Sequence, residues 1–257
     1  MKKPFFCGAG GIVSADIAVP EHEREVNFYS TVLGTGEAPL WREDLMNNLG
    51  TPIIGLGART PEYEDLPLQW MPHIQVADVA ASAALAVQLG GKDLMHGKSE
   101  DGTSQWALLS DPAEVAFGVI PAVVNAPTYD APENERFGCI SGLSLRVFDA
   151  NQIADFYRQV IGWGAKSAAS SSNKPTNDFE MHIEDETASI EIREMASKED
   201  GIPQAWLIHL PVADFAESIR RVSAGGGEVI EQCGDESYAI VRDPVGVCFV
   251  VAAESSL

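Results

Sequence analysis

Apolar and polar residues alternate along this chain in patterns that are typical first of a strand and then of a helix. In the stretch ADIAVPEHEREVNFYSTVLG, Ile17 and Val19 alternate with other residues at the period of two that a strand requires. Val26, Tyr29 and Leu33 then fall at the spacing that puts side chains on one face of a helix. The stretch therefore predicts a strand followed by an amphipathic helix, whose charged residues we expect to face solvent.

The same pattern returns in the second half of the chain, which indicates an internal repeat. SLRVFDANQIADFYRQVIG matches the first stretch, since in each a valine precedes a Phe-Tyr pair by nine residues. MPHIQVADVAASAALAVQLGG and LIHLPVADFAESIRRVSAGGG match each other, with Gly-Gly twelve residues after the aspartate of Val-Ala-Asp. Asp78 and Asp214 stand where a helix N-cap belongs, and Gly90 and Gly226 stand where a helix ends.

Each half closes on an apolar strand, an Asp-Pro turn and a second apolar strand, in WALLSDPAEVAFGVIPA and YAIVRDPVGVCFVVAA. These repeats predict four βαβββ modules, two in each half. Because the segment between the halves is rich in proline, asparagine and acid, it is typical of a linker. We expect a first domain at residues 1–122, a linker at 123–137 and a second domain at 138–257. The sequence leaves open which modules pair.

The order of these motifs resembles the vicinal oxygen chelate superfamily, which includes glyoxalase I, extradiol dioxygenases, and the fosfomycin and bleomycin resistance proteins. The resemblance covers almost the whole chain, in the layout of two-domain bacterial glyoxalase-like proteins. It implies an α+β fold, in which paired modules curl mixed sheets into cups with helices on the outside. It also implies a floor of His, Gln or Glu that binds a divalent metal in the enzymatic members.

The positions that would bind this metal, mapped from the resemblance, are occupied by poor ligands for a hard metal ion. These positions are Ser14, Met71 and Gly118 in the first half, and Gly142, Leu207 and Val250 in the second. We therefore expect a protein that binds a small organic molecule in a cupped pocket without a metal. The alternative is a metal-dependent lyase or dioxygenase of the same superfamily with a displaced site for Mn, Fe, Ni or Zn. The candidate ligands of that displaced site are Asp16, His73, Glu191 and His209.

Several other residues are candidates for lining the pocket. Side chains on one strand face recur every two residues, which puts Asp16, His73, Gln75, Arg146 and His209 on the face of the mapped positions. His73 and His209 occupy matching places in the repeat, either as hydrogen-bonded wall or interface groups or as proton-transfer groups. Aromatic rings also suit such a pocket, and the candidates are Trp41 and Trp106. We expect Trp70, Trp163 and Trp206 to pack in the core.

Charge narrows the partners that the chain could bind. It has 38 acidic and 17 basic residues and a net charge of -21, which repels nucleic acid and anionic lipid, so we expect neither as a partner. It has no apolar run of about eighteen residues, no signal peptide pattern and no C-x-x-C pair among its cysteines. We expect a cytoplasmic monomer or homodimer.

The sequence does not define a catalytic activity. No G-x-S-x-G motif predicts a nucleophilic serine. Whether the chain is an enzyme or a non-catalytic interaction module stays open at this point.

Overall fold

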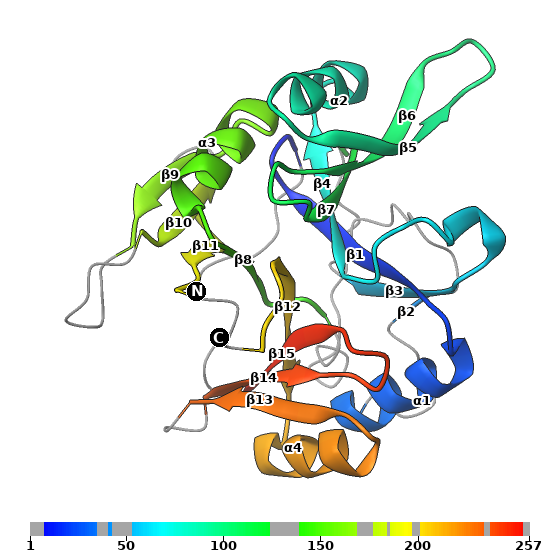
Figure 1. The fold of residues 1–257 in the computed structure, drawn as a ribbon, viewed down its shortest axis with the longest axis vertical. Coiled ribbons are helices and arrows are strands. Elements are labelled where there is room, and N and C mark those ends of the chain that lie inside the picture. The colour runs from blue at the N-terminus through cyan, green and yellow to red at the C-terminus, as the bar shows by residue number, and fades with distance from the viewer. Residues whose placement is uncertain are drawn as a thin grey trace.

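The computed structural model describes residues 8–34, 41–42, 53–123, 139–168, 177–183, 186–196, 201–233 and 237–253. These residues form two mixed β-sheets with helices packed on them (Figure 1). The first sheet has seven strands in the order β2-β3-β1-β4-β7-β6-β5. The second has eight strands in the order β13-β14-β15-β12-β8-β11-β10-β9. The expected α+β fold is confirmed.

The elements of the first sheet and its helices come from the first half of the chain. They are β1 (Ile12–Val19), α1 (His22–Leu33), β2 (Trp41–Arg42), β3 (Ile53–Ala58), the 3-10 helix η1 (Pro61–Tyr63), β4 (Met71–Val76), α2 (Val79–Gln88), β5 (Lys92–Lys98), β6 (Ser104–Ser110) and β7 (Ala116–Pro121). The second half supplies β8 (Gly142–Val147), α3 (Ala150–Val160), β9 (Gly164–Ser167), β10 (Phe179–Ile183), β11 (Glu186–Glu194), β12 (Ala205–Val212), α4 (Phe215–Ala224), β13 (Glu228–Gln232), β14 (Tyr238–Arg242) and β15 (Cys248–Ala253).

Three of the four modules have the complete βαβββ order, and the first shows two strands after its helix among the described residues. Consecutive modules share a sheet, because β1 pairs antiparallel with β4 and β8 pairs antiparallel with β12. The linker at 123–137 lies almost wholly outside the described residues, so the domain boundaries stay a prediction.

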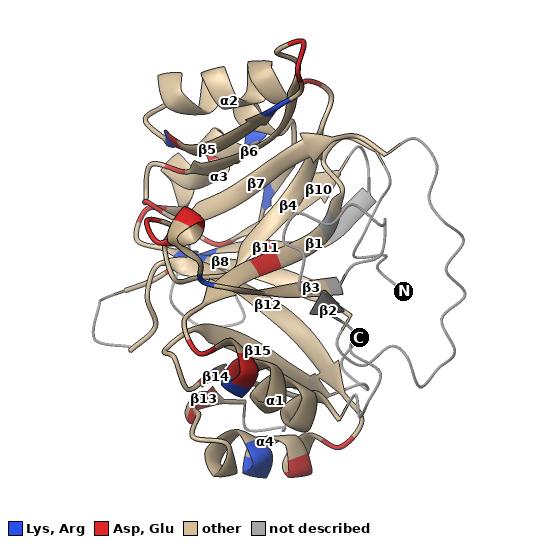
Figure 2. Cartoon of the chain, turned by 90° about the vertical axis from the view of Figure 1, so that its right-hand side faces the viewer, with Lys and Arg blue, Asp and Glu red and all other residues tan. Residues whose placement is uncertain are grey.

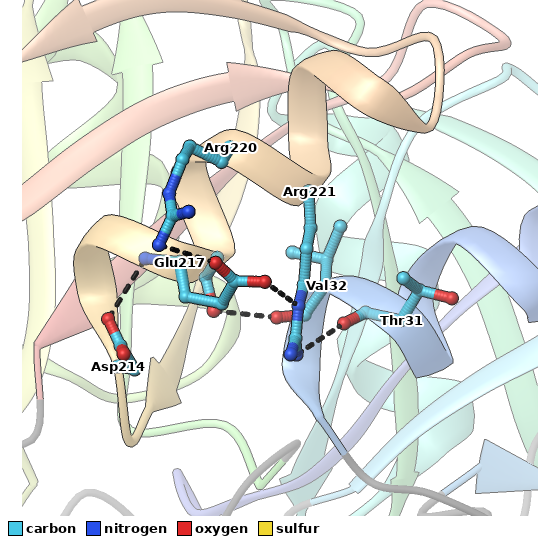
Figure 3. A network of polar contacts seen from close by, with 7 residues as sticks. Thr31, Val32, Asp214, Glu217, Arg220 and Arg221 are labelled. Carbon is cyan, nitrogen blue, oxygen red and sulfur yellow. Dashed lines mark hydrogen bonds and ion pairs between the residues drawn. The ribbon is translucent and has the colours of Figure 1, made fainter.

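The helices pair in the opposite way, across the two halves. Helix α1 lies beside α4, and α2 lies beside α3. Ser218 on α4 donates to the carbonyl of Val32 at the end of α1 at 2.7 Å, and Arg221 caps the carbonyl of Thr31 at 3.1 Å (Figure 3). Ser82 on α2 makes the equivalent bond to Val160 of α3 at 3.1 Å. The repeat therefore extends to the contacts that join the halves.

One contiguous core holds side chains from both sheets and from all four helices. Trp70, Trp163 and Trp206 are buried in it, as expected, and the indole of Trp163 donates to the carbonyl of Gly10 at 2.8 Å. The prediction for the charged face of the first helix was wrong at one residue. Glu25 is fully buried, because α1 turns this side chain toward the Asp-Pro turn that carries Asp243.

The two Asp-Pro turns explain why the chain contains this hairpin twice. In the second, Oδ1 of Asp243 accepts backbone hydrogen bonds from Val245 and Val247 at 3.1 and 2.7 Å, which closes the turn. Oδ2 accepts from the hydroxyl of Tyr29 at 3.0 Å. Asp111 does the same with Tyr157 at 3.3 Å, so each turn is joined to the Phe-Tyr helix of the other half.

Among the described residues, acidic side chains are scattered over several elements and loops and do not gather in one segment (Figure 2). Among the described residues, no helix is long and apolar enough to span a membrane.

Candidate functional site

The first sheet carries a cavity of about 110 Å³ on the face away from the shared core, which we call the first cup. An apolar cluster that is separate from the main core forms most of its wall. The lining residues are Asp16, Tyr63, Leu66, Met71, His73, Met95, Trp106 and Leu108. Trp106 lies across Gly97 on the neighbouring strand, where any Cβ would collide with the indole. Of the pocket candidates, the structure places Asp16, His73 and Trp106 in the wall of this cavity.

His73 and Asp16 form the polar part of this apolar cup. Their side chains are 1% and 3% exposed, and Nδ1 of His73 lies 3.5 Å from Oδ2 of Asp16. The same nitrogen lies 2.9 Å from the hydroxyl of Ser14, directly opposite on β1. Since these two oxygens surround Nδ1, we assign the ring proton to that nitrogen, which leaves Nε2 as an acceptor.

Nε2 of His73 is buried and has no hydrogen-bond partner among the described residues. Burial lowers the pKa of His73, and the charge of Asp16 opposes this shift only in part. The imidazole is therefore neutral near pH 7, with a lone pair that only a ligand or an ordered water would satisfy.

The ring of His73 occupies the space that a side chain at Gly118 would need. Gly118 pairs directly with His73 across β7 and β4. A Cβ at Gly118 would collide with Cδ2 of the ring and lie 3.2 Å from Nε2. In the second sheet, a Cβ at Gly142 would lie 3.3 Å from Nδ1 of His209. At these two mapped metal positions, a histidine ring from the neighbouring strand thus lies in place of a ligand.

The corresponding face of the second sheet, the second cup, is more highly charged. We define it by Ser144, Arg146, Glu191, Arg193, Leu207, His209, Tyr238, Ile240 and Val250, which share this face by strand register. Nε2 of His209 lies 2.6 Å from the hydroxyl of Ser144. Burial, and then the charges of Arg193 and Arg146, lower the pKa of His209 to about 4. The structure therefore places Arg146 and His209 together, on a different sheet from Asp16 and His73.

The remaining sequence candidates have other surroundings. Gln75 does not line the cavity, because its Oε1 accepts from the backbone of Gly8 and Val123 at 3.2 and 2.8 Å. The side chain of Trp41 lies outside the described residues. Glu191 pairs with Arg193 at 2.5 Å in the second sheet.

The four candidate ligands of a displaced metal site are thus divided between the sheets, two on each. In the described part of the chain, no three His, Cys, Asp or Glu side chains group as a metal site would require. In the first cup, Nδ1 of His73 faces Asp16, and Nε2 has no partner among the described residues. A metal ion could therefore bind one imidazole nitrogen there. The residues described do not fit a stable divalent site.

The sequence analysis did not predict one array of polar side chains, which is formed by Asp93, His96 and Ser104. Nδ1 of His96 lies 3.0 Å from Asp93 and Nε2 lies 2.8 Å from the hydroxyl of Ser104, in the order of a Ser-His-Asp triad. His96 pairs with Ala107, whose side chain is in the main core, so the array lies on the face opposite the first cup. We interpret it as a tie within the β5–β6 hairpin. The bulged register of that hairpin could not be foreseen from spacing.

Comparison with known proteins agrees with this architecture. Residues 143–252 match the family model of a glyoxalase-like domain. The Mn(II)-bound glyoxalase from Novosphingobium aromaticivorans aligns with a TM-score of 0.60 and 15% identity, over 97% of this chain and 83% of that one. The 2,3-dioxygenase LapB from Pseudomonas sp. KL28 aligns with a TM-score of 0.55 and 13% identity, over 96% and 93%.

An extradiol ring-cleaving dioxygenase from B. fuscum aligns with a TM-score of 0.55 and 13% identity, over 98% of this chain and 74% of that one. No curated protein sequence matches the chain. At such identities the likeness shows the fold alone. Together with the glyoxalase-like match over residues 143–252, the shared fold confirms the resemblance to the vicinal oxygen chelate superfamily.

Proposed function

We propose that this protein binds a small, mostly apolar organic molecule in the first cup, through a hydrogen bond from the ligand to His73. One observation carries the proposal: Nε2 of His73 is buried without a partner in the wall of an apolar cavity. A buried acceptor left unsatisfied costs about 1–3 kcal/mol, and a hydroxyl-bearing ligand would remove that cost. Ser14 and Asp16 orient the ring for this role.

Size limits the ligand or the part of it that enters. A cavity of about 150 Å³ is known to hold benzene. The first cup, at about 110 Å³, suits a short chain or a small ring. Tyr63, Met95 and Trp106 at its wall are amphipathic or adaptable side chains that would cover such a group.

The comparisons favour the metal-dependent alternative over the expectation of no metal, since a similar fold is found in a Mn(II)-bound glyoxalase. The residues of this chain support binding without a metal. Serine, methionine and glycine stand at the mapped positions of the first cup, and a histidine ring fills the space above Gly118. The proposal therefore involves no metal in binding.

Native mass spectrometry of freshly purified protein, beside a denatured control and elemental analysis, tests this choice. We expect a metal-free mass, with or without an organic adduct. Stoichiometric Mn, Fe, Ni or Zn that is lost in His73→Ala would instead support a lyase or dioxygenase with a displaced site. Titration with phenol and with benzene then tests the hydrogen bond, since only phenol donates to Nε2. We expect His73→Phe to abolish the preference for phenol.

A second candidate is proton transfer by His73, which would make the protein an enzyme that acts without a metal. The supporting observation is that a neutral imidazole is held by a carboxylate at Nδ1 and has an open Nε2, as a general base requires. Deuterium exchange at an acidic C–H of bound small ketones would detect it. Exchange at equal rates in wild type and His73→Gln would eliminate the candidate. A cytoplasmic location and a monomeric or homodimeric state are also part of the proposal.

A further inference from the structure

Two arginines lie directly opposite one another in the second cup. Arg146 on β8 and Arg193 on β11 are register partners in a parallel strand pair, so their side chains leave the sheet on the same face. The face is that of the cup, because Ser144, on the same face of β8 as Arg146, pairs with Leu207, which lies in the apolar cluster of the cup. Like charges at facing positions destabilise a sheet. Such a pair is retained at a cost unless something of opposite charge lies between them.

Of the two guanidinium groups, that of Arg193 alone has an ion-pair partner in the part of the chain that the structure describes. Arg193 forms an ion pair with Glu191 at 2.5 Å. Arg146 is partly buried and makes no hydrogen bond or ion pair among the described residues, and its Nε is buried without an acceptor. The carboxylates of Glu231 and Asp178 are close enough to act on Arg146 electrostatically, but neither forms an ion pair with it. A guanidinium in this state requires an acceptor that the described residues do not provide.

An apolar cluster lies on the same face and begins on β12, the strand next to β8. It is separate from the main core and contains Ile202, Leu207, Ile240, Cys248 and Val250, with Ile230 and Tyr238 packed against it. Leu207 joins the two regions, since it pairs with Ser144, whose neighbour on the same face of β8 is Arg146. The cup is thus cationic at β8 and β11 and apolar at β12, β14 and β15.

We propose that the second cup binds an organic carboxylate, with its acid group between Arg146 and Arg193 and its apolar body against Ile230 and Tyr238, the partly buried side chains that pack on the apolar cluster. The planar fork of a guanidinium matches the two oxygens of a carboxylate, and Arg146 has its Nε available for one of them. A purely inorganic anion would make no use of the apolar surface of Ile230 and Tyr238. The net charge of -21 repels anions at long range, so attraction is local to this cup. The site does not depend on the ligand of the first cup.

Methyl-resolved NMR of the full chain tests both the ligand class and its place. The probes are hexanoate, hexanamide and inorganic phosphate, at matched ionic strength. We expect hexanoate to shift the methyl signals of Ile230 and of Leu207 and Ile240 in the cluster that it packs on, and to bind at least about tenfold more tightly than hexanamide. Shifts confined to Leu66 and Leu108 would place the acid in the first cup and overturn the inference, without affecting the proposal for that cup. Equal binding of the amide, or binding of phosphate as tight as hexanoate, would also overturn it.

Charge-removing variants then identify the residues. Arg146→Gln should weaken hexanoate binding at least about tenfold, and Arg193→Gln should weaken it less because Glu191 already neutralises that group. The matched control is Arg158→Gln, which removes the same charge from α3, where Arg158 is 54% exposed and paired with Asp155. An equal effect of Arg158→Gln would mean that overall charge, rather than a site, governs binding. If Arg146→Gln does not fold, Arg146→Lys, which keeps the charge and loses the fork, answers the same question.

Discussion

The hydroxyl of Tyr29 on α1 donates to Oδ2 of Asp243 at 3.0 Å, across 214 residues of sequence. Tyr157 and Asp111 repeat this bond at 3.3 Å, so the first helix of each half is bonded to the closing turn of the other. Both tyrosines are fully buried, and burial is the main reason that the pKa of each is raised well above its ordinary value. The halves therefore stabilise each other through two equivalent buried bonds.

Removing one of these hydroxyls should destabilise the whole chain. We expect Tyr29→Phe to lower the free energy of unfolding by about 1–3 kcal/mol, because the bond ends on a buried carboxyl group. Tyr157→Phe should lower it by a similar amount. Urea denaturation followed by tryptophan fluorescence measures both. Tyr63→Phe, at the wall of the first cup, is the control and should change stability little. If one half of Tyr29→Phe unfolded at a lower urea concentration than the other half, the bond would not couple the unfolding of the two halves.

The sequence predicted those features that depend on nearby residues. Asp78 and Asp214 cap their helices as expected, accepting from Ala81 and Glu217 at 2.9 Å, because an N-cap involves residues three apart. The two-residue period put Asp16 and His73 on one face of the sheet, and both line the cavity of the first cup. Both features need only local geometry.

Contacts that depend on strand register or on the packing of the halves could not be predicted. The Phe-Tyr repeat gave no sign that Tyr29 reaches Asp243, and Glu25 was expected in solvent because neighbouring helix residues are charged. The facing of Arg146 and Arg193 depends on the register between β8 and β11, which lie more than one strand apart in the chain. Periodicity assigns a face to a side chain and leaves its cross-strand neighbour undetermined.

Glu25 should make stability depend on pH. Burial, and then the charge of Asp243, raise its pKa from 4.5 to about 8, so the folded state keeps a proton that the unfolded state loses above pH 4.5. The contribution of Glu25 is therefore full below about pH 4.5 and is lost as pH rises toward 8. As pH rises from 5 to 8, we expect the free energy of unfolding of Glu25→Gln to increase by on the order of 2 kcal/mol relative to that of the wild type. Urea denaturation at pH 5, 6.5 and 8 measures it, with exposed Glu23→Gln as control; parallel curves for wild type and Glu25→Gln would contradict the assignment.

His209 should also make stability depend on pH, but with the opposite sign to Glu25 and at lower pH. Its folded pKa is about 4 and its ordinary value is 6.5, so stability is lost as pH falls from 6.5 toward 4, where only the unfolded state gains the proton. Because Arg193 and Arg146 contribute to this shift, Arg146→Gln should raise the pKa of His209 measured by NMR titration. Arg158→Gln should leave it unchanged. A pKa that stays near 4 in Arg146→Gln would show that Arg146 does not contribute to the shift.

Gly118→Ala tests whether the His73 ring has taken the place of a metal ligand. The added Cβ would collide with Cδ2 of the ring, which is itself 1% exposed and has little room to move. We expect a loss of about 1–3 kcal/mol in unfolding free energy, together with a changed ¹⁵N shift at Nε2 and weaker phenol binding. The matched control is Gly142→Ala, where the added carbon lies 3.2 Å from the backbone oxygen of Ser189 and 3.3 Å from Nδ1 of His209, and a few tenths of an ångström of movement relieve both contacts. If Gly118→Ala changed neither the unfolding free energy nor the NMR signals of His73, the ring would not lie over Gly118. The space above Gly118 would then be open to a carboxylate, and Gly118→Glu would become the variant in which to look for metal binding.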